Sequence, residues 1–177
     1  MSERTLPLGR LGSLRLSARL SALLGTLLLG AALSAIAVLV VQVPLAEAVL
    51  FGLLTVVVHW ISDIVHQLGH AWAARRTGYP MAGIRLWWVL STAVYPQNEP
   101  RLPAALHIRR AFGGPTMSLM VTLVAAVLAV LAQPLGGIVW WLAAFLFLDN
   151  LLVFTLGSLL PLSFTDGSTL LHWWGKC

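Results

Sequence analysis

The chain has 177 residues, of which 59% are apolar and only 10% are charged. Soluble domains are roughly 45–50% apolar and about 25% charged, so the composition excludes an ordinary water-soluble domain and indicates a lipid environment. Nucleic acid is excluded as a partner despite the net charge of +5, because the arginines flank apolar segments and do not alternate with aromatic residues.

The first predicted element is a transmembrane helix over Leu20–Val43, which carries no charge and exceeds the roughly 20 residues needed to cross a bilayer. A signal peptide is the competing interpretation, because a basic segment precedes it, but the apolar run is longer than the roughly 7–15 residues of such peptides. We expect a basic cytoplasmic leader over residues 1–19 and a single transmembrane domain over residues 20–177. The leader's four arginines are Arg4, Arg10, Arg15 and Arg19.

Three more membrane spans follow from the distribution of charge and turn residues. The second has Asp63 as its only formal charge and stops at Arg75 and Arg76. The third and fourth share one long uncharged stretch that the sequence Gln133–Gly137 breaks with proline and glycine. The predicted spans are Ala48–Ala74, Thr116–Ala132 and Ile138–Leu160.

The segment between the second and third spans is rich in glycine and proline and should be irregular. Within it, Ile84–Tyr95 is aromatic and β-branched enough to predict a short strand or a membrane-surface segment. All eleven lysine and arginine residues lie in the leader, in this segment or near the C-terminus. Because such residues collect in cytoplasmic loops, we expect an even number of spans with both termini in the cytoplasm.

Four ionisable or polar residues of the second span, His59, Asp63, His66 and His70, follow one another at steps of four, three and four. This spacing places them on one helical stripe. His66 and His70 are one turn apart and can bind one metal ion through two imidazoles. The single cysteine is Cys177, so any metal site must use nitrogen and oxygen ligands.

Asp166 is the candidate third ligand. It follows the fourth span, which returns toward the cytoplasm, and His66 and His70 lie within three turns of Arg75 at the cytoplasmic end of the second span. The three residues are therefore expected at a similar membrane depth. Two alternatives stay open for Asp166: a turn aspartate before Gly167, or an N-cap for a helix over Ser168–Trp174.

These motifs together resemble the site-2 protease family of intramembrane zinc metalloproteases, which carries His-Glu-x-x-His on one transmembrane helix and Asp-Gly near the end of a later one. The resemblance covers about residues 48–172. It implies a four-helix core, zinc bound by His66, His70 and Asp166, and hydrolysis of a peptide bond within a transmembrane segment of another protein. The matching residues are His66, Gly69, His70, Ala71, Pro161, Asp166 and Gly167, with Gly113-Gly114-Pro115 similar to the element that opens the family's middle helix.

The important departure from the family pattern is Gln67, which stands where the family has the catalytic glutamate. That glutamate accepts a proton from water at the metal and passes it to the leaving amine. Glutamine has the same size but cannot accept the proton. Asp63, one turn earlier, is a conceivable substitute base, although we favour a supporting role in which it accepts a ring N–H of His59 or His66.

Asp149 and Asn150 form a second polar pair, predicted either to bond across helices or to line a substrate groove. The preferred hypothesis is an all-α membrane protein of about four helices, a zinc metalloprotease-like protein whose activity Gln67 impairs. The alternative is an inactive metal-binding pseudoprotease that binds other membrane proteins. A third hypothesis is a carrier or sensor that moves metal or protons along the histidine stripe.

Overall fold

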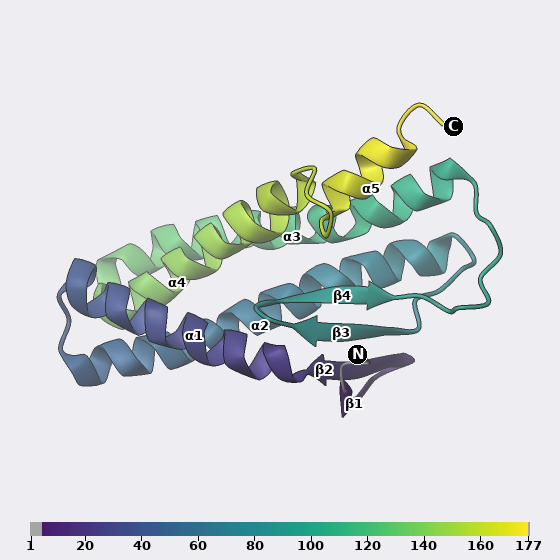
Figure 1. The fold of residues 1–177 in the computed structure, drawn as a ribbon. Coiled ribbons are helices and arrows are strands. Elements are labelled where there is room, and N and C mark those ends of the chain that lie inside the picture. Colours follow the sequence, from purple (N-terminus) through teal and green to yellow (C-terminus); the bar gives the residue numbers. More distant parts are fainter. Residues whose placement is uncertain (1–4, 177) are drawn as a thin grey trace.

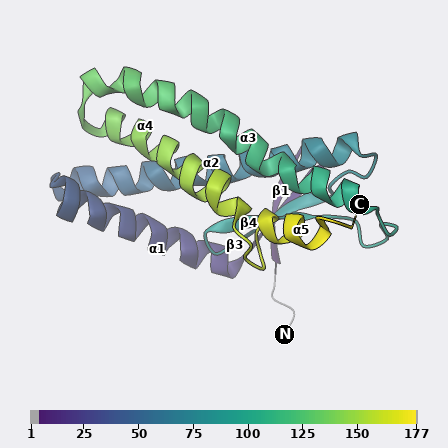
Figure 2. The same ribbon diagram turned by 90° about the horizontal axis from the view of Figure 1, so that it is seen from above.

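The computed structural model describes residues 5–176, so Arg4 and Cys177 lie outside the described residues. Four long helical segments run antiparallel to their chain neighbours (Figure 1). α2 and α3 extend beyond the other two, and a small sheet and the short α5 flank this extension (Figures 1 and 2). The helices are α1 Leu20–Ile36, α2 Leu45–Arg76, α3 Ala104–Ala132, α4 Gly137–Asp149 and α5 Asp166–Trp173, with π-helical η1 Ala37–Val41 and η3 Asn150–Leu156 and 3₁₀ turns η2 Gln133–Leu135 and η4 Gly157–Leu159.

All four long segments have the length and apolar composition needed to cross a membrane. Their bounds are Leu20–Val41, Leu45–Arg76, Ala104–Leu135 and Gly137–Leu159, close to those predicted for the first, second and fourth spans. Turns separate them where expected: Gln42 adopts a left-handed φ of 60° before α2, and Gly136 and Gly137 have positive φ between α3 and α4.

The third span begins 12 residues earlier than predicted, at Ala104 instead of Thr116. We expected Gly113-Gly114-Pro115 to open this helix, but Pro115 lies inside it and Pro103 is the N-cap. A proline in a helix interior removes one backbone donor and clashes with the preceding turn, which ordinarily favours a boundary. Here the helix continues through it.

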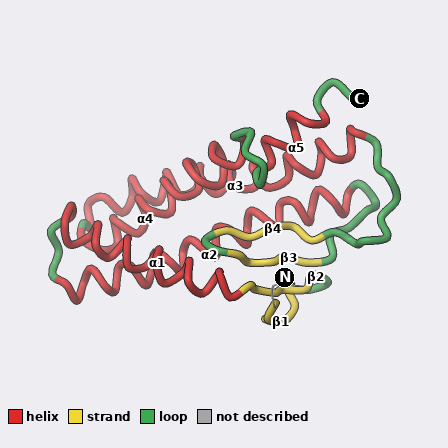
Figure 3. Tube along the Cα trace, viewed as in Figure 1, coloured by secondary structure: helices red, strands yellow, loops and turns green. Residues whose placement is uncertain are grey.

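Residues 5–19 and the segment after α2 form a four-stranded sheet in the order β1-β2-β3-β4 (Figure 3). The strands are β1 Thr5–Leu11, β2 Leu14–Arg19, β3 Gly83–Trp87 and β4 Leu90–Val94. β2 and β3 are parallel, and the other neighbours are antiparallel. The prediction of an all-α protein with at most a short strand between the second and third spans therefore describes the sheet only in part. Ile84–Tyr95, predicted as one short strand or a membrane-surface segment, contains two strands joined by a turn. The basic segment ahead of α1 supplies the other two strands.

The β3–β4 hairpin enters the helical bundle with its turn first. The backbone of Trp88 in this turn lies so close to Gly25 of α1 that a Cβ on Gly25 would be 2.4 Å from the Trp88 carbonyl. One face of the sheet packs on α2 through a core that contains Leu14, Met81 and Ile84. The hairpin therefore places β4 against α2, next to the polar stripe predicted from the sequence.

Candidate metal centre

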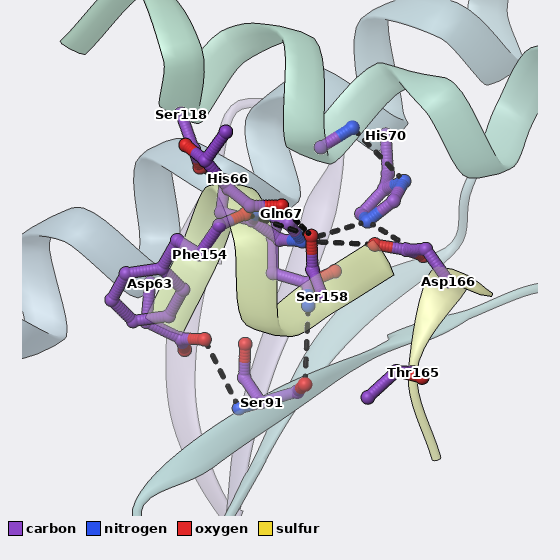
Figure 4. Close-up of polar contacts among 12 residues, drawn as sticks. Asp63, His66, Gln67, His70, Ser91, Ser118, Phe154, Ser158, Thr165 and Asp166 are labelled. Carbon is purple, nitrogen blue, oxygen red and sulfur yellow. Dashed lines mark hydrogen bonds and ion pairs between the residues drawn. The ribbon is translucent and has the colours of Figure 1, made fainter. Parts of the chain in front are cut away.

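The structure brings His66, His70 and Asp166 together (Figure 4). The two imidazole Nε2 atoms are 3.1 Å apart. His66 Nε2 is 3.3 Å from Asp166 Oδ2, and His70 Nε2 is 3.3 Å from Asp166 Oδ1. Both histidines are buried, and Asp166 is partly buried at the first turn of α5, directly after its N-cap Thr165. Asp166 thus belongs to a short helix that docks beside α3.

Hydrogen bonds at the opposite ring nitrogens fix the orientation of both imidazoles. His70 Nδ1 is 2.9 Å from the backbone carbonyl oxygen of Arg110, and His66 Nδ1 is 2.9 Å from Ser118 Oγ. His70 Nδ1 also lies 3.2 Å from the Gly114 N–H, which only donates, whereas the Arg110 carbonyl only accepts, so Nδ1 makes one of these two hydrogen bonds at a time. The shorter contact, to Arg110, is the one made when Nδ1 carries the proton. When His66 likewise donates to Ser118, the two Nε2 lone pairs point at each other. A cation between them removes this repulsion, as at zinc sites whose histidines donate their second ring N–H.

The close crossing of α2 and α3 keeps the centre open. A Cβ on Gly114 would lie 2.3 Å from His70 Nε2 and 2.4 Å from His66 Nε2, so only glycine fits there. Gly69 and Gly113 make an equally close contact between the two helices, each within 2.5 Å of the other's carbonyl oxygen if it carried a Cβ. Pro115 follows directly in α3, and the Arg110 carbonyl, one turn before Gly114, accepts from His70.

The donor set fits a zinc ion. Ligand atoms about 2.0–2.1 Å from zinc at tetrahedral angles lie roughly 3.3–3.4 Å from one another. The two Nε2 atoms are 3.1 Å apart, close to this value, and each lies 3.3 Å from a different oxygen of Asp166. One ligand atom from each of the three residues lies within 4.8 Å of the other two. Two imidazoles and one carboxylate also match the three-ligand sets of catalytic zinc. The group could therefore hold a metal ion.

Gln67 and Asp63 line the same cavity but bond to the hairpin, not to the imidazoles. Gln67 Nε2 donates to the backbone carbonyl oxygen of Ser91 at 3.1 Å, and the backbone N–H of Ser91 donates to Asp63 Oδ1 at 3.2 Å (Figure 4). Among residues 5–176, Gln67 Oε1 and Asp63 Oδ2 are buried without a hydrogen-bond partner. The predicted bond from a ring N–H of His59 or His66 to Asp63 is thus replaced by a bond from β4.

His59 lies deeper in the bundle and bonds two acceptors. Its Nδ1 is 3.1 Å from Asp149 Oδ1, and its Nε2 is 2.6 Å from the backbone carbonyl oxygen of Val89 in the hairpin turn. The carbonyl only accepts, so His59 Nε2 donates to Val89, while His59 Nδ1 and the Asp149 carboxyl share a proton. The sequence suggested Asp63 as its partner, because Asp63 is on the same helix.

Asp149 and Asn150 are buried between helices and are not among the cavity-lining residues. Asn150 Nδ2 donates to Ser62 Oγ at 2.9 Å, while Asp149 bonds His59. The prediction that they line a substrate groove is therefore not supported, and the alternative, bonding across helices, is what the structure has. Residues that approach the centre and that sequence reasoning missed are Ser91 and Ser118; neither carries a recognisable motif.

A cavity of about 560 Å³ surrounds the centre. Its wall includes the free side of β4 from Leu90 to Ala93, the loop before α5, and Tyr95 and Glu99 from the segment that leads to α3. Buried Arg110 closes this wall: it bonds both oxygens of Glu99, one at 2.9 Å, and its guanidinium lies 4.4 Å from the Tyr95 ring. Hydrogen bonds from Arg110 lower the pKa of Glu99, and burial raises the pKa of Tyr95 to about 12.

Comparison with solved structures gives a clear fold. The chain is similar to the Site-2 Protease from Methanocaldococcus jannaschii, with a TM-score of 0.65 and 18% identity, over 96% of this chain and 70% of that chain. Scans against protein-family descriptions and curated proteins gave no match. The chain therefore has a membrane metalloprotease-like fold and is an integral membrane protein. The resemblance read from the motifs is confirmed for the fold.

Proposed function

We propose that this chain is a zinc-binding membrane protein of the site-2 protease type whose cavity takes a transmembrane segment of another protein and whose peptidase activity is weak or absent. The single observation that carries the proposal is the convergence of His66, His70 and Asp166: their ligand atoms, one from each residue, lie within 4.8 Å of one another, and each Nε2 is 3.3 Å from an oxygen of the Asp166 carboxylate. That spacing suits one zinc ion, and three protein ligands leave a fourth position open.

The other residues around the proposed zinc site have separate roles. Ser118 and the Arg110 carbonyl hold the two imidazoles as neutral ligands by accepting their Nδ1 protons. Arg110 also holds Glu99 in the cavity wall. Bound zinc would supply Lewis acidity, polarising a peptide carbonyl and acidifying water. Gln67 cannot accept a proton, so the general base that peptide hydrolysis needs is missing at its usual place.

A second candidate function is an active peptidase in which Asp63 supplies the base. The observation that favours it is the Asp63 carboxylate itself, whose Oδ2 is buried, lines the cavity and has no hydrogen-bond partner among residues 5–176. Asp63 is one turn of α2 before Gln67, so a proton would have to travel through an intervening water or amide. We rank this candidate second because Asp63 Oδ1 is already used by Ser91.

Zinc analysis and cleavage assays on the same preparations test the proposal. We expect about one zinc per chain in detergent-purified protein and none in the His66→Ala, His70→Ala double variant. Cleavage of a panel of single-span membrane substrates should be at or near background. An unchanged zinc content in the double variant would contradict the assignment. Strong zinc-dependent cleavage that Asp63→Asn abolishes, with zinc retained, would instead establish the second candidate.

A further inference from the structure

We propose that Gln67 and Asp63 form a latch that closes the free edge of β4 beside the metal centre. On this proposal, a peptide segment pairs with that edge only after Gln67 releases Ser91. The proposal rests on the proposed function in one respect, that the cavity admits a segment of another protein. The latch itself concerns the chain's own hairpin and forms with or without metal.

β4 is the last strand of the sheet and pairs with β3 on one side only. Its other side faces α2, and there both backbone polar groups of Ser91 are engaged: the N–H by Asp63 at 3.2 Å and the C=O by Gln67 at 3.1 Å. An unpaired strand edge ordinarily offers such groups to an incoming strand. At Ser91, two side chains one helical turn apart occupy them instead.

The alternating direction of backbone N–H and C=O groups along β4 determines which residues can pair with an incoming peptide. Every second residue turns its N–H and C=O to the same edge, so Ala93 offers the next pair after Ser91. Ala93 lines the cavity together with His66, His70 and Asp166. A segment that pairs at Ala93 alone would be held by one residue, whereas release of Ser91 extends the pairing along the cavity wall.

The latch leaves one oxygen of each side chain without a hydrogen-bond partner among residues 5–176, which favours release of Ser91 when a peptide binds. Gln67 Oε1 and Asp63 Oδ2 are buried without a hydrogen-bond partner among residues 5–176. A buried unsatisfied oxygen costs stability, and the N–H groups of an incoming backbone could satisfy both atoms. The latch also depends on the amide: an ionised carboxylate at position 67 has no proton to donate to the Ser91 carbonyl.

Thiol labelling at Ser91 measures the latch directly. The Ser91 hydroxyl is buried and unbonded within residues 5–176, so Ser91→Cys in a Cys177→Ser background leaves both backbone bonds intact. We expect Gln67→Met, which has similar length but no donor, to raise the labelling rate by roughly 2- to 10-fold, the range for one hydrogen bond. Gln133→Met makes the same chemical change at the exposed far end of α3 and should leave the rate unchanged.

Two changes at Asp63 give an independent test if Gln67→Met folds poorly. Asp63→Leu removes the acceptor of the Ser91 N–H and should also speed labelling, whereas Asp63→Asn keeps an acceptor oxygen and should not. Equal labelling rates in the parent, Gln67→Met and Asp63→Leu would overturn the latch. Zinc content measured on the same samples separates the two proposals: absence of zinc from all forms contradicts the proposed function and leaves the labelling result to decide the latch.

Discussion

Gln67 donates its side-chain amide to the backbone carbonyl oxygen of Ser91 at 3.1 Å, which joins the helix that carries His66 and His70 to the strand that lines the cavity. Gln67, which stands where the His-Glu-x-x-His motif has glutamate, thus makes a bond that an ionised glutamate cannot make. This bond couples the chemistry of position 67 to the position of β4. Substitutions at Gln67 should therefore change catalysis and hairpin stability together.

Gln67→Glu should create or restore peptidase activity and at the same time destabilise the hairpin. A positioned general base is typically worth about 10²–10⁴-fold in rate, whereas leaving the Ser91 carbonyl without its donor costs about 1–3 kcal/mol. Cleavage of single-span substrates at equal zinc occupancy measures the first effect, and thermal unfolding measures the second. Inactivity of both forms would favour the alternative that the chain is an inactive metal-binding pseudoprotease. Robust activity of the parent would indicate that Asp63 supplies the general base.

Much of this architecture can be predicted from the sequence because it depends on patterns within continuous segments of the chain. Uncharged runs and the turn at Gln133–Gly137 mark three of the four spans to within a few residues. The spacing of His66 and His70 places two imidazoles on one helical face, and the Asp166-Gly167 motif points to the third side chain. These features need only side-chain type and helical period.

The contacts of the α2 stripe could not be read in the same way. His59, Asp63 and Gln67 all bond the backbone of the hairpin, at Val89 and Ser91, and a backbone group carries no sequence signature. The start of α3 was misplaced because Pro115, ordinarily a boundary, lies inside the helix, which begins after its N-cap Pro103. β1 and β2 were missed because their arginines were read only as membrane-flanking charge.

Asp149→Asn should destabilise the protein by about 1–3 kcal/mol, the range for losing a charged hydrogen bond. Asp149 is the partner of His59 Nδ1, and His59 Nε2 donates to Val89, so an amide at position 149 removes the carboxyl group that shares a proton with the buried imidazole. The matched control is Glu47→Gln, the same change from carboxyl to amide at an exposed residue in the first turn of α2, which should leave stability unchanged. Thermal unfolding at neutral pH measures both, and equal stability of Asp149→Asn and the parent would argue against a stabilising His59–Asp149 bond.

The Glu99–Arg110 pair should give the cavity wall a dependence on pH. Arg110 lowers the pKa of Glu99, so the pair contributes stability above the ordinary carboxyl pKa and loses it as pH falls through the lowered value. The difference in Tm between the parent and Glu99→Gln should be largest at neutral pH and shrink as the pH drops below about 4. A difference that stays constant across this range would show that the pair contributes no titrating charge.

Both termini should face the cytoplasm. Between residues 5 and 176, the lysines and arginines lie in β1, β2, β3, at the end of α2, at the start of α3 and in the segments before α3 and after α5, which gather at one end of the bundle (Figure 1). Membrane-impermeant thiol labelling of intact cells, with the single Cys177 as reporter, should modify the protein only after the cells are opened. Labelling from outside would place the sheet and the metal centre on the opposite side of the membrane.

Gly114→Ala should abolish or strongly weaken metal binding while leaving the helices in place. The added Cβ would lie 2.3 Å from His70 Nε2 and 2.4 Å from His66 Nε2, on the atoms that would bind the ion, so both imidazoles must turn away. We expect a loss of about 10–100-fold in zinc affinity, the range typical when the support of a metal ligand is disturbed. Competition with a zinc chelator measures this loss.

Gly30→Ala is the matched control for that change, because it also adds one methyl group to a glycine of a spanning helix. Its Cβ would meet the tip of Val56 at 3.3 Å and the Gly52 carbonyl oxygen at 3.9 Å, neither of which belongs to the candidate metal centre, and the Val56 side chain can rotate aside. Zinc affinity should therefore match the parent. Equal affinity in Gly114→Ala as well would mean that the ion, if bound, does not lie between His66 and His70, and the assignment of the centre would fail.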